Sequence, residues 1–373
     1  MRHDGHSKAL FSFESSSFAM NEDYVPRPDE IIHSTGDFKQ VNSSEAYGKV
    51  GLPWLSLEVG KDDLWWGPGR HGVLMISDNT DSKDMLKLFA SVGPFRFTSF
   101  TAALRSKHGS KFISGHRLEI DIIDRICLAL HETILADRFE LSYLNPFTTH
   151  MISMPMAEYG RKGAPGYFAD NLLIGGDASI KIVKNLQLYG ELMVDDFQPH
   201  LGFKTFRNWD SKYGILMGVY YVNPFALRDT DFRIEYAFIN QYAYTHENPV
   251  TAYTNRSRTI GHQIGPDADD IFLNLKSWIT NYLQASLAYE LERQGEGDVN
   301  KPHPPDAPND DEWEFLSGIR EITHSFSFGL SYLSIGNYFV DADYTYSRIK
   351  NAAHKLNVDE SRQQIVIEAG YRF

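Results

Sequence analysis

The sequence predicts an all-β protein, an antiparallel up-and-down transmembrane β-barrel of about 14–18 strands, with long external loops and short periplasmic turns. Three observations predict it. Segments of alternating apolar and polar residues recur along the chain, short connections between them alternate with long ones, and the last segment ends on the aromatic residues Tyr371 and Phe373. Because successive side chains on a strand point to opposite faces of a sheet, such segments place one apolar face toward lipid.

The composition fits a barrel and excludes several other classes. The 373 residues include 20 Tyr, 24 Phe and 6 Trp, as expected where aromatic girdles mark both membrane boundaries. The chain has no run of eighteen apolar residues, which excludes a membrane-spanning helix. The 49 Asp and Glu against 36 Lys and Arg give a net charge of -13, which argues against nucleic acid as a partner. A single cysteine, Cys127, excludes an intramolecular disulfide.

Strands are expected wherever the alternation is regular. Near the C-terminus, for example, Ile365 and Ile367 share one face with Tyr371, while Glu368 lies on the other face. The expected strands cover 117–122, 126–131, 186–195, 232–238, 271–276, 283–291, 326–332, 338–346 and 363–373, with less regular segments at 50–60, 94–103, 172–184 and 213–222.

The connections also alternate in length. Tight turns are expected near 124, 185, 224, 280 and 335, and long polar loops at 135–170, 195–212, 242–270, 292–320 and 347–362. Short turns at one end and long loops at the other are typical of an outer-membrane barrel, and they make the last strand run inward, with Phe373 on the periplasmic side. A soluble β-sandwich or soluble barrel is the alternative, but the many tyrosines and phenylalanines at strand ends favour the membrane barrel.

The chain is expected to form one barrel domain over residues 47–373. Residues 1–46 are polar and fit a plug, a strand pair or a leader. The first residues contain no apolar core resembling a signal peptide, so the sequence is expected to be a mature form or a fragment of an exported protein. The expected location is the outer membrane of a Gram-negative bacterium.

The least ordinary local sequence is a Trp-Trp-Gly-Pro-Gly-Arg motif. Sugars stack on planar aromatic rings, so the motif is a candidate glycan platform; the alternative, which we favour, is that the two tryptophans lock a loop against the barrel wall. It is no phosphate loop, because the Gly-x4-Gly-Lys-Ser/Thr spacing is absent. The candidates for glycan binding or loop formation are Trp65, Trp66, Gly67, Pro68, Gly69 and Arg70.

A second group of candidates is polar and faces the expected lumen. These residues could bind a sugar chain, but cross-strand ion pairs are the favoured interpretation. The lumen-facing candidates are Arg117, Glu119, Asp121 and His131.

Other chemistry has weaker support. Asp267, Asp269 and Asp270 with His262 could bind a divalent cation, but solvated loop charge is the favoured interpretation. No His-Glu-x-x-His or Gly-x-Ser-x-Gly motif is present, so no metal site, cofactor or catalytic residue is predicted. His131 and His324 are the residues that a barrel-embedded hydrolase would use; polar wall residues are the more economical interpretation.

The chain resembles the Wzi-type capsule assembly outer-membrane proteins. The resemblance is carried by residues 64–79, 116–119, 138–146 and 261–270, together with Glu132. It implies a lectin-like, non-catalytic barrel that binds and helps anchor capsular or exopolysaccharide at the cell surface. The terminal aromatic strand resembles the signal by which outer-membrane barrels are recognised for assembly, so the expected partners also include the barrel assembly machinery, through the C-terminal strand, and outer-membrane lipids. Members of the family have a longer N-terminal region, with helical material that helps close the barrel.

Two alternatives remain for the function. The same barrel could be a channel or porin for small solutes, or, with less support, a lipid hydrolase. An open lumen would favour the channel and a plugged lumen the binding protein.

Overall fold

The computed structural model describes residues 8–20, 31–35, 38–107, 109–159, 170–196, 208–304, 312–333 and 338–371, with only the backbone described before residue 46. Phe373 and the turn expected near 335 lie outside these residues.

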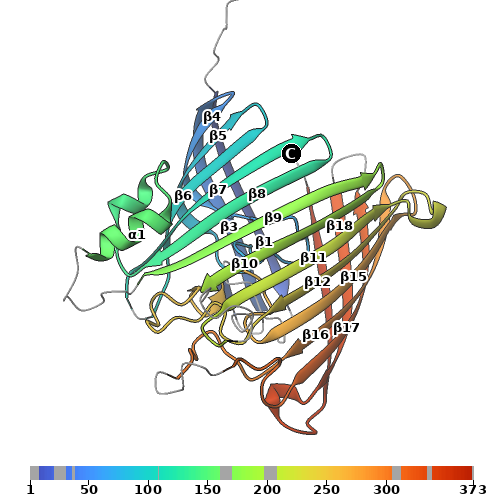
Figure 1. Ribbon diagram of the computed structural model, residues 1–373. Coiled ribbons are helices and arrows are strands. Elements are labelled where there is room, and N and C mark those ends of the chain that lie inside the picture. Colours follow the sequence, from blue (N-terminus) through green and yellow to red (C-terminus); the bar gives the residue numbers. More distant parts are fainter. Residues whose placement is uncertain are drawn as a thin grey trace, which may run out of the picture.

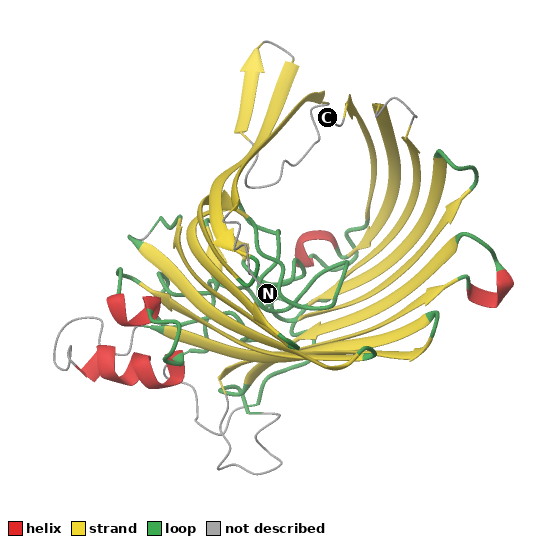
Figure 2. Cartoon of the chain, turned by 90° about the horizontal axis from the view of Figure 1, so that it is seen from above, coloured by secondary structure: helices red, strands yellow, loops and turns green. Residues whose placement is uncertain are grey.

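The predicted fold class is confirmed: 17 strands form one antiparallel sheet that curves into a barrel (Figures 1 and 2). Each strand from β3 to β12 pairs with the next one in sequence, as do the strands from β15 to β19, and β12 pairs with β15. Among the described residues, no register pairs β19 with β1. The strands of this sheet are β1 (Lys8–Met20), β2 (Ile31–Thr35), β3 (Phe38–Leu52), β4 (Leu55–Asp62), β5 (Lys83–Val92), β6 (Phe95–Leu104), β7 (Lys111–Ile123), β8 (Ile126–Ala136), β9 (Asn171–Val183), β10 (Leu186–Asp196), β11 (Lys212–Val222), β12 (Thr230–Ile239), β15 (Ala268–Trp278), β16 (Leu283–Gln294), β17 (Glu321–Leu333), β18 (Tyr338–Lys350) and β19 (Glu360–Tyr371).

The remaining elements lie in the connections. Strands β13 (Thr254–Asn255) and β14 (Arg258–Thr259) form a separate small hairpin. The helical elements are η1 (Leu141–Leu144), α1 (His150–Tyr159), η3 (Pro224–Ala226) and η4 (Ala352–His354). Within the described residues, no helix has the length and apolar character needed to cross a membrane.

Short and long connections lie at opposite ends of the barrel, as the sequence predicts. Two residues separate β5 from β6, β7 from β8 and β9 from β10. The long connections cover 63–82, 137–170, 197–211, 240–267, 295–320 and 351–359.

One strand prediction was wrong, and strand β5 was missed. The segment 50–60 is not one strand, because a turn at Pro53 and Trp54 divides it between β3 and β4. Strand β5 was not predicted because its alternation is broken: the lumen-facing Met85 is apolar and packs in the buried core, while Leu86 on the opposite face is exposed. The boundary expected at residue 46 falls within β3.

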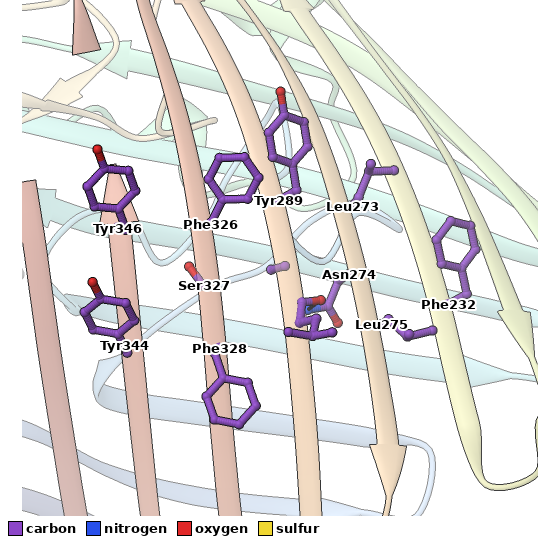
Figure 3. Close-up of a pocket in the computed structure, with 12 residues that line it drawn as sticks. Phe232, Leu273, Asn274, Leu275, Tyr289, Phe326, Ser327, Phe328, Tyr344 and Tyr346 are labelled. Carbon is purple, nitrogen blue, oxygen red and sulfur yellow. Dashed lines mark hydrogen bonds between the residues drawn. The ribbon is translucent and has the colours of Figure 1, made fainter. Parts of the chain in front are cut away.

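The barrel has two apolar regions. On the outer face, Ile365 and Ile367 of β19 are 70% and 63% exposed, as befits side chains that face lipid. Further round, β12 and β15 to β18 carry a shallow apolar groove of about 440 Å³ lined largely by aromatic rings (Figure 3). The second region is a buried core inside the barrel, formed by wall residues and by the long loops (Figure 2). The labelled aromatic residues of the groove are Phe232, Tyr289, Phe326, Phe328, Tyr344 and Tyr346.

Candidate functional site

The connection between β4 and β5, residues 63–82, is here called the central loop, and it folds into the barrel. Its residues 73–76 have no exposed surface. The backbone N–H of Trp66 donates to the carbonyl of Ile76 at 2.9 Å, which holds the two arms of the loop together. The loop is therefore part of the interior of the barrel.

The β12–β15 loop, residues 240–267, packs against the central loop. The Tyr244 hydroxyl donates to the carbonyl of Leu74 at 2.5 Å, and the Tyr253 hydroxyl donates to that of Met75 at 2.8 Å. Burial raises the pKa of Tyr244 well above its usual range, so its hydroxyl remains a donor. The two loops thus satisfy each other's polar groups within an apolar core.

A wall carboxylate, Glu191 of β10, binds the tip of the central loop. Its two oxygens accept the backbone N–H groups of Leu74 at 3.0 Å and Met75 at 3.1 Å. Because its two oxygens accept two neighbouring backbone N–H groups at once, this contact fixes the tip of the loop to the wall.

A second wall carboxylate, Glu235 of β12, binds the preceding turn of the loop. Its oxygens accept the backbone N–H groups of Arg70 at 2.8 Å and His71 at 2.9 Å. The Tyr189 hydroxyl donates to the same carboxylate at 2.6 Å. Glu235 and Glu191 therefore hold neighbouring parts of one loop from two strands.

The side chain of His71 makes a third contact with the wall. Its ring stacks on Phe272 with centroids 3.9 Å apart, and its Nε2 lies 2.8 Å from a carboxylate oxygen of Glu290 and 3.4 Å from one of Asp270. Burial disfavours the charged ring, but the hydrogen bond to Glu290 and the nearby carboxylates outweigh this and raise the pKa of His71.

The two tryptophans of the motif have different surroundings. Trp66 is 4% exposed; its ring meets the edge of Phe100 at a centroid distance of 5.2 Å and stacks beside His131 at 6.3 Å. Trp65 is half-buried, and its indole N–H donates to the carbonyl of Gly69 at 3.0 Å. Trp66 therefore packs in the lumen, whereas Trp65 closes a turn within the loop.

The rest of the motif shapes this turn. Gly67 has φ +148, and a Cβ there would lie 2.6 Å from a Glu191 oxygen and 2.7 Å from Val73, so the close approach of loop and wall requires glycine. Pro68 is half-buried, Gly69 is buried, and the Arg70 side chain is exposed.

The structure brings Arg117 and His131 together with Glu119. Arg117 donates to Asp177 of β9 at 2.6 Å and to Glu119 at 3.2 Å, and its Nη1 lies 2.8 Å from His131 Nδ1. Asp121 joins this group through Arg96 of β6, which pairs with both Asp121 and Glu119. These side chains form ion pairs across strands β6 to β9.

The residues considered for a cation site, Asp267, Asp269, Asp270 and His262, are buried, which corrects the expectation of solvated loop charge. Their side chains also do not meet at one point. Asp267 is 1% exposed and accepts N–H groups of Gly297 and Ser317 from the next loop. Asp269 and Asp270 point to opposite faces of β15: Asp269 pairs with Arg293, and Asp270 lies near His71. His262, 1% exposed, lies over Gly72, and burial lowers its pKa to about 3.

A family model for the capsule assembly protein Wzi matches residues 4–114 and 178–364, well over half of the chain. The chain belongs to the Wzi family. A comparison with curated proteins gives no match. Among solved structures, the chain is similar to Wzi of Escherichia coli, an outer-membrane protein involved in group 1 capsule assembly and a carbohydrate-binding β-barrel. The identity is 13% and the TM-score 0.62, over 98% of this chain and 83% of that chain.

The chain is also similar to OccK1 (OpdK) of Pseudomonas aeruginosa, with 9% identity and a TM-score of 0.50 over 97% of this chain and 87% of that chain. At such identities the likeness shows the fold alone. Family and fold together make this Wzi-family chain a β-barrel of the Gram-negative outer membrane.

At its long-loop end, this Wzi-family barrel carries a group of aromatic rings on the outer wall, here called the rim cluster. Phe238 lies at centroid distances of 6.0 Å from Tyr213 and 5.7 Å from both Trp313 and Phe315. Phe315 is 42% exposed, and the Arg293 guanidinium lies 5.7 Å from its ring centroid. The rim cluster thus offers planar apolar surface beside the positive charge of Arg293.

Sequence reasoning missed the residues that position the central loop. Glu191 and Glu235 lie on the polar faces of the strands expected at 186–195 and 232–238, so their lumen-facing direction could be predicted. Their partners are backbone N–H groups of a distant loop, which have no signature in the sequence.

Proposed function

We propose that this Wzi-family barrel binds capsular or exopolysaccharide at the cell surface and helps to anchor it there, without catalysing a reaction. Family membership supports this proposal, as does the carbohydrate binding described for Wzi of Escherichia coli.

The single observation that carries the proposal is the packing of the lumen. Residues 73–76 of the central loop and Tyr244 and Tyr253 of the β12–β15 loop have no exposed surface. The side chains of Glu191 and Glu235 in the wall accept backbone N–H groups of the central loop and hold it in place. A barrel built to pass solutes would need this space, whereas a binding protein gains a rigid support for its external loops.

We place the glycan contacts at the long-loop end. Aromatic rings provide large, rigid contact surfaces, and the rim cluster presents such rings where the chain meets the outside. Trp66 is too buried to touch a polymer, so the Trp-Trp-Gly-Pro-Gly-Arg motif, from Trp65 to Arg70, serves to organise the central loop. The outer face meets lipid, and the terminal strand is the segment that the barrel assembly machinery would recognise.

The hydrolase alternative lacks a site around its two candidate histidines. His131 lies in the lumen, 3% exposed, between Trp66 and Arg117. His324 lies on the outer face, with its Nδ1 2.9 Å from the Tyr289 hydroxyl. The barrel wall separates the two rings, so they do not share a reaction centre.

Cosedimentation with polysaccharide extracted from the source bacterium tests the proposal. Trp313→Ala with Phe315→Ala should weaken retention by about tenfold, equivalent to about 1.4 kcal/mol. Phe147→Ala, which removes a ring that is 93% exposed on the α1 side, is the matched control and should have no effect. Equal retention of polysaccharide by the native protein, the double variant and Phe147→Ala would contradict the placement of the glycan contacts at the rim cluster. No retention by the native protein would contradict the proposed function.

Two further measurements separate the alternatives. A strain that lacks the gene should make normal amounts of polysaccharide but release it into the medium; unchanged attachment would refute the anchoring role. In planar lipid bilayers the purified protein should give no steady current, whereas a stable open-channel current would favour the channel.

A further inference from the structure

Three side chains with metal-binding groups meet on the outer wall, beneath α1. His116 of β7 and Glu132 of β8 are direct cross-strand partners, and His150 is the first residue of α1. Their neighbours Arg117 and His131 point into the lumen, so His116 and Glu132 point outward. Helix α1 lies outside the barrel beside these strands (Figure 1).

The three groups are close and buried. His116 Nδ1 lies 2.9 Å from Glu132 Oε1, and the rings of His116 and His150 stack with centroids 4.4 Å apart. One ligand atom from each residue lies within 4.8 Å of the other two. His116 is 8%, Glu132 9% and His150 0% exposed. A polar cluster of this kind is expensive to bury unless its atoms have partners.

Several of these polar atoms have no partner in the described part of the chain. Both ring nitrogens of His150 and Nε2 of His116 are buried without a hydrogen bond. Glu132 accepts the backbone N–H of His150 at 2.8 Å, but no Lys or Arg of the described residues forms an ion pair with it. The cluster therefore combines free nitrogen lone pairs with a buried negative charge.

We propose that His116, Glu132 and His150 bind a divalent transition metal ion of the zinc type, which fastens α1 to the barrel wall. Two imidazoles and one carboxylate form a familiar zinc set, which leaves a fourth position for water. Tetrahedral zinc with bonds of about 2.0–2.2 Å holds its ligand atoms about 3.4 Å apart, so small side-chain movements would complete the site. Such an ion would neutralise Glu132 and use the nitrogen atoms that have no partner.

The surroundings fit a structural ion. The Tyr143 ring packs against His150 at a centroid distance of 5.6 Å, and its hydroxyl donates to Asp170 at 2.6 Å. Arg138 also pairs with Asp170, at 2.7 Å. These contacts hold the residues before α1, and the metal ion would hold the start of the helix itself. This inference does not depend on the proposed polysaccharide binding.

Zinc binding by the full chain in detergent, without a polyhistidine tag, tests the proposal. After treatment with a chelator, the native protein should take up one tightly held Zn²⁺ more per chain than Glu132→Gln or His150→Gln, measured by elemental mass spectrometry. Added Zn²⁺ should raise the Tm of the native protein and not of these variants. His324→Gln, which removes another outward-facing histidine, should behave like the native protein.

Two results would overturn the proposal: native protein that binds no zinc at micromolar concentration, or variants that bind as much as the native protein. Heat-modifiable migration on gels shows whether each variant is folded. Should His150→Gln fail to fold, X-ray absorption of the native protein with Zn²⁺ decides the question, because two imidazoles and one carboxylate are expected around the ion. A different ligand set would refute the site.

Discussion

Glu191 accepts the backbone N–H of Leu74 at 3.0 Å, although 117 positions separate the two residues in the sequence. Both lie in the interior, with Glu191 3% and Leu74 0% exposed. This single contact connects the wall of the barrel with the tip of the loop that fills it.

Glu191→Gln should therefore destabilise the protein. An amide has only one acceptor oxygen, so one of the two loop N–H groups would lose its partner. The expected loss is about 1–3 kcal/mol in the free energy of unfolding, measured by denaturant titration in detergent. Glu368→Gln, on the lumen side of the last strand and exposed, is the control and should change stability little. Equal effects of both substitutions would show that the loop contact is unimportant.

Two glycines with positive φ differ in what an added side chain would meet. Gly67→Ala should be the more damaging, because its Cβ would lie 2.6 Å from Glu191 and 2.7 Å from Val73, in addition to the backbone cost of its φ of +148. Gly93→Ala has only the backbone cost of its φ of +60, about 1 kcal/mol, since a Cβ there meets nothing within 4 Å. Thermal unfolding should place Gly67→Ala clearly below Gly93→Ala, and the reverse order would contradict the described turn.

The two arginines of the wall should differ in importance. Arg117→Ala leaves Asp177 buried without its main partner, and such changes cost about 3–5 kcal/mol. Arg96→Ala breaks a pair with Asp121 that is much more exposed, so about 0.2–1 kcal/mol is expected. The free energies of unfolding of the two variants provide the comparison. A larger effect at Arg96 would be inconsistent with this assignment.

His71 should give the stability a dependence on pH. Its pKa is raised above the ordinary value of 6.5 in the folded protein, although burial opposes this, because Glu290, Asp270 and Glu235 favour the charged ring. A raised pKa means that the stabilisation is complete below about pH 6.5, the value in the unfolded chain, and is lost as the pH rises through the folded-state pKa.

The native protein should therefore exceed His71→Gln in Tm most at acidic pH, and the difference should shrink toward alkaline pH. Glutamine keeps an N–H donor but does not titrate, so the pH dependence of the difference reports the charge, while the lost stacking on Phe272 is independent of pH. A difference that grows with rising pH would contradict the sign.

Much of the wall could be predicted from the sequence because lipid imposes a simple rule. Residues such as Ile365 and Ile367 must be apolar where they face the bilayer, and the alternation that results marks the strand. The rule failed at β5, where the lumen side is also apolar because Met85 packs in the buried core.

The interior could not be predicted in the same way. Its contacts join a wall carboxylate such as Glu235 to the backbone of a loop 164 and 165 positions away, and backbone groups are the same in every residue. The sequence marked the Trp-Trp-Gly-Pro-Gly-Arg motif as unusual, yet the different roles of Trp65 and Trp66 depend on burial. Buried aspartates such as Asp267 were taken for solvent-exposed charge because their partners lie in another loop.

The filled interior also has a consequence for the order of folding. The central loop follows β4, but Glu191 and Glu235, which bind it, belong to β10 and β12. Such non-local contacts form slowly, since long stretches of chain must be ordered first. The central loop reaches these partners only once β10 and β12 are in place, although its own flanking strands β4 and β5 come much earlier in the chain. Docking of the loop therefore becomes a late step of folding, which follows the placement of β12.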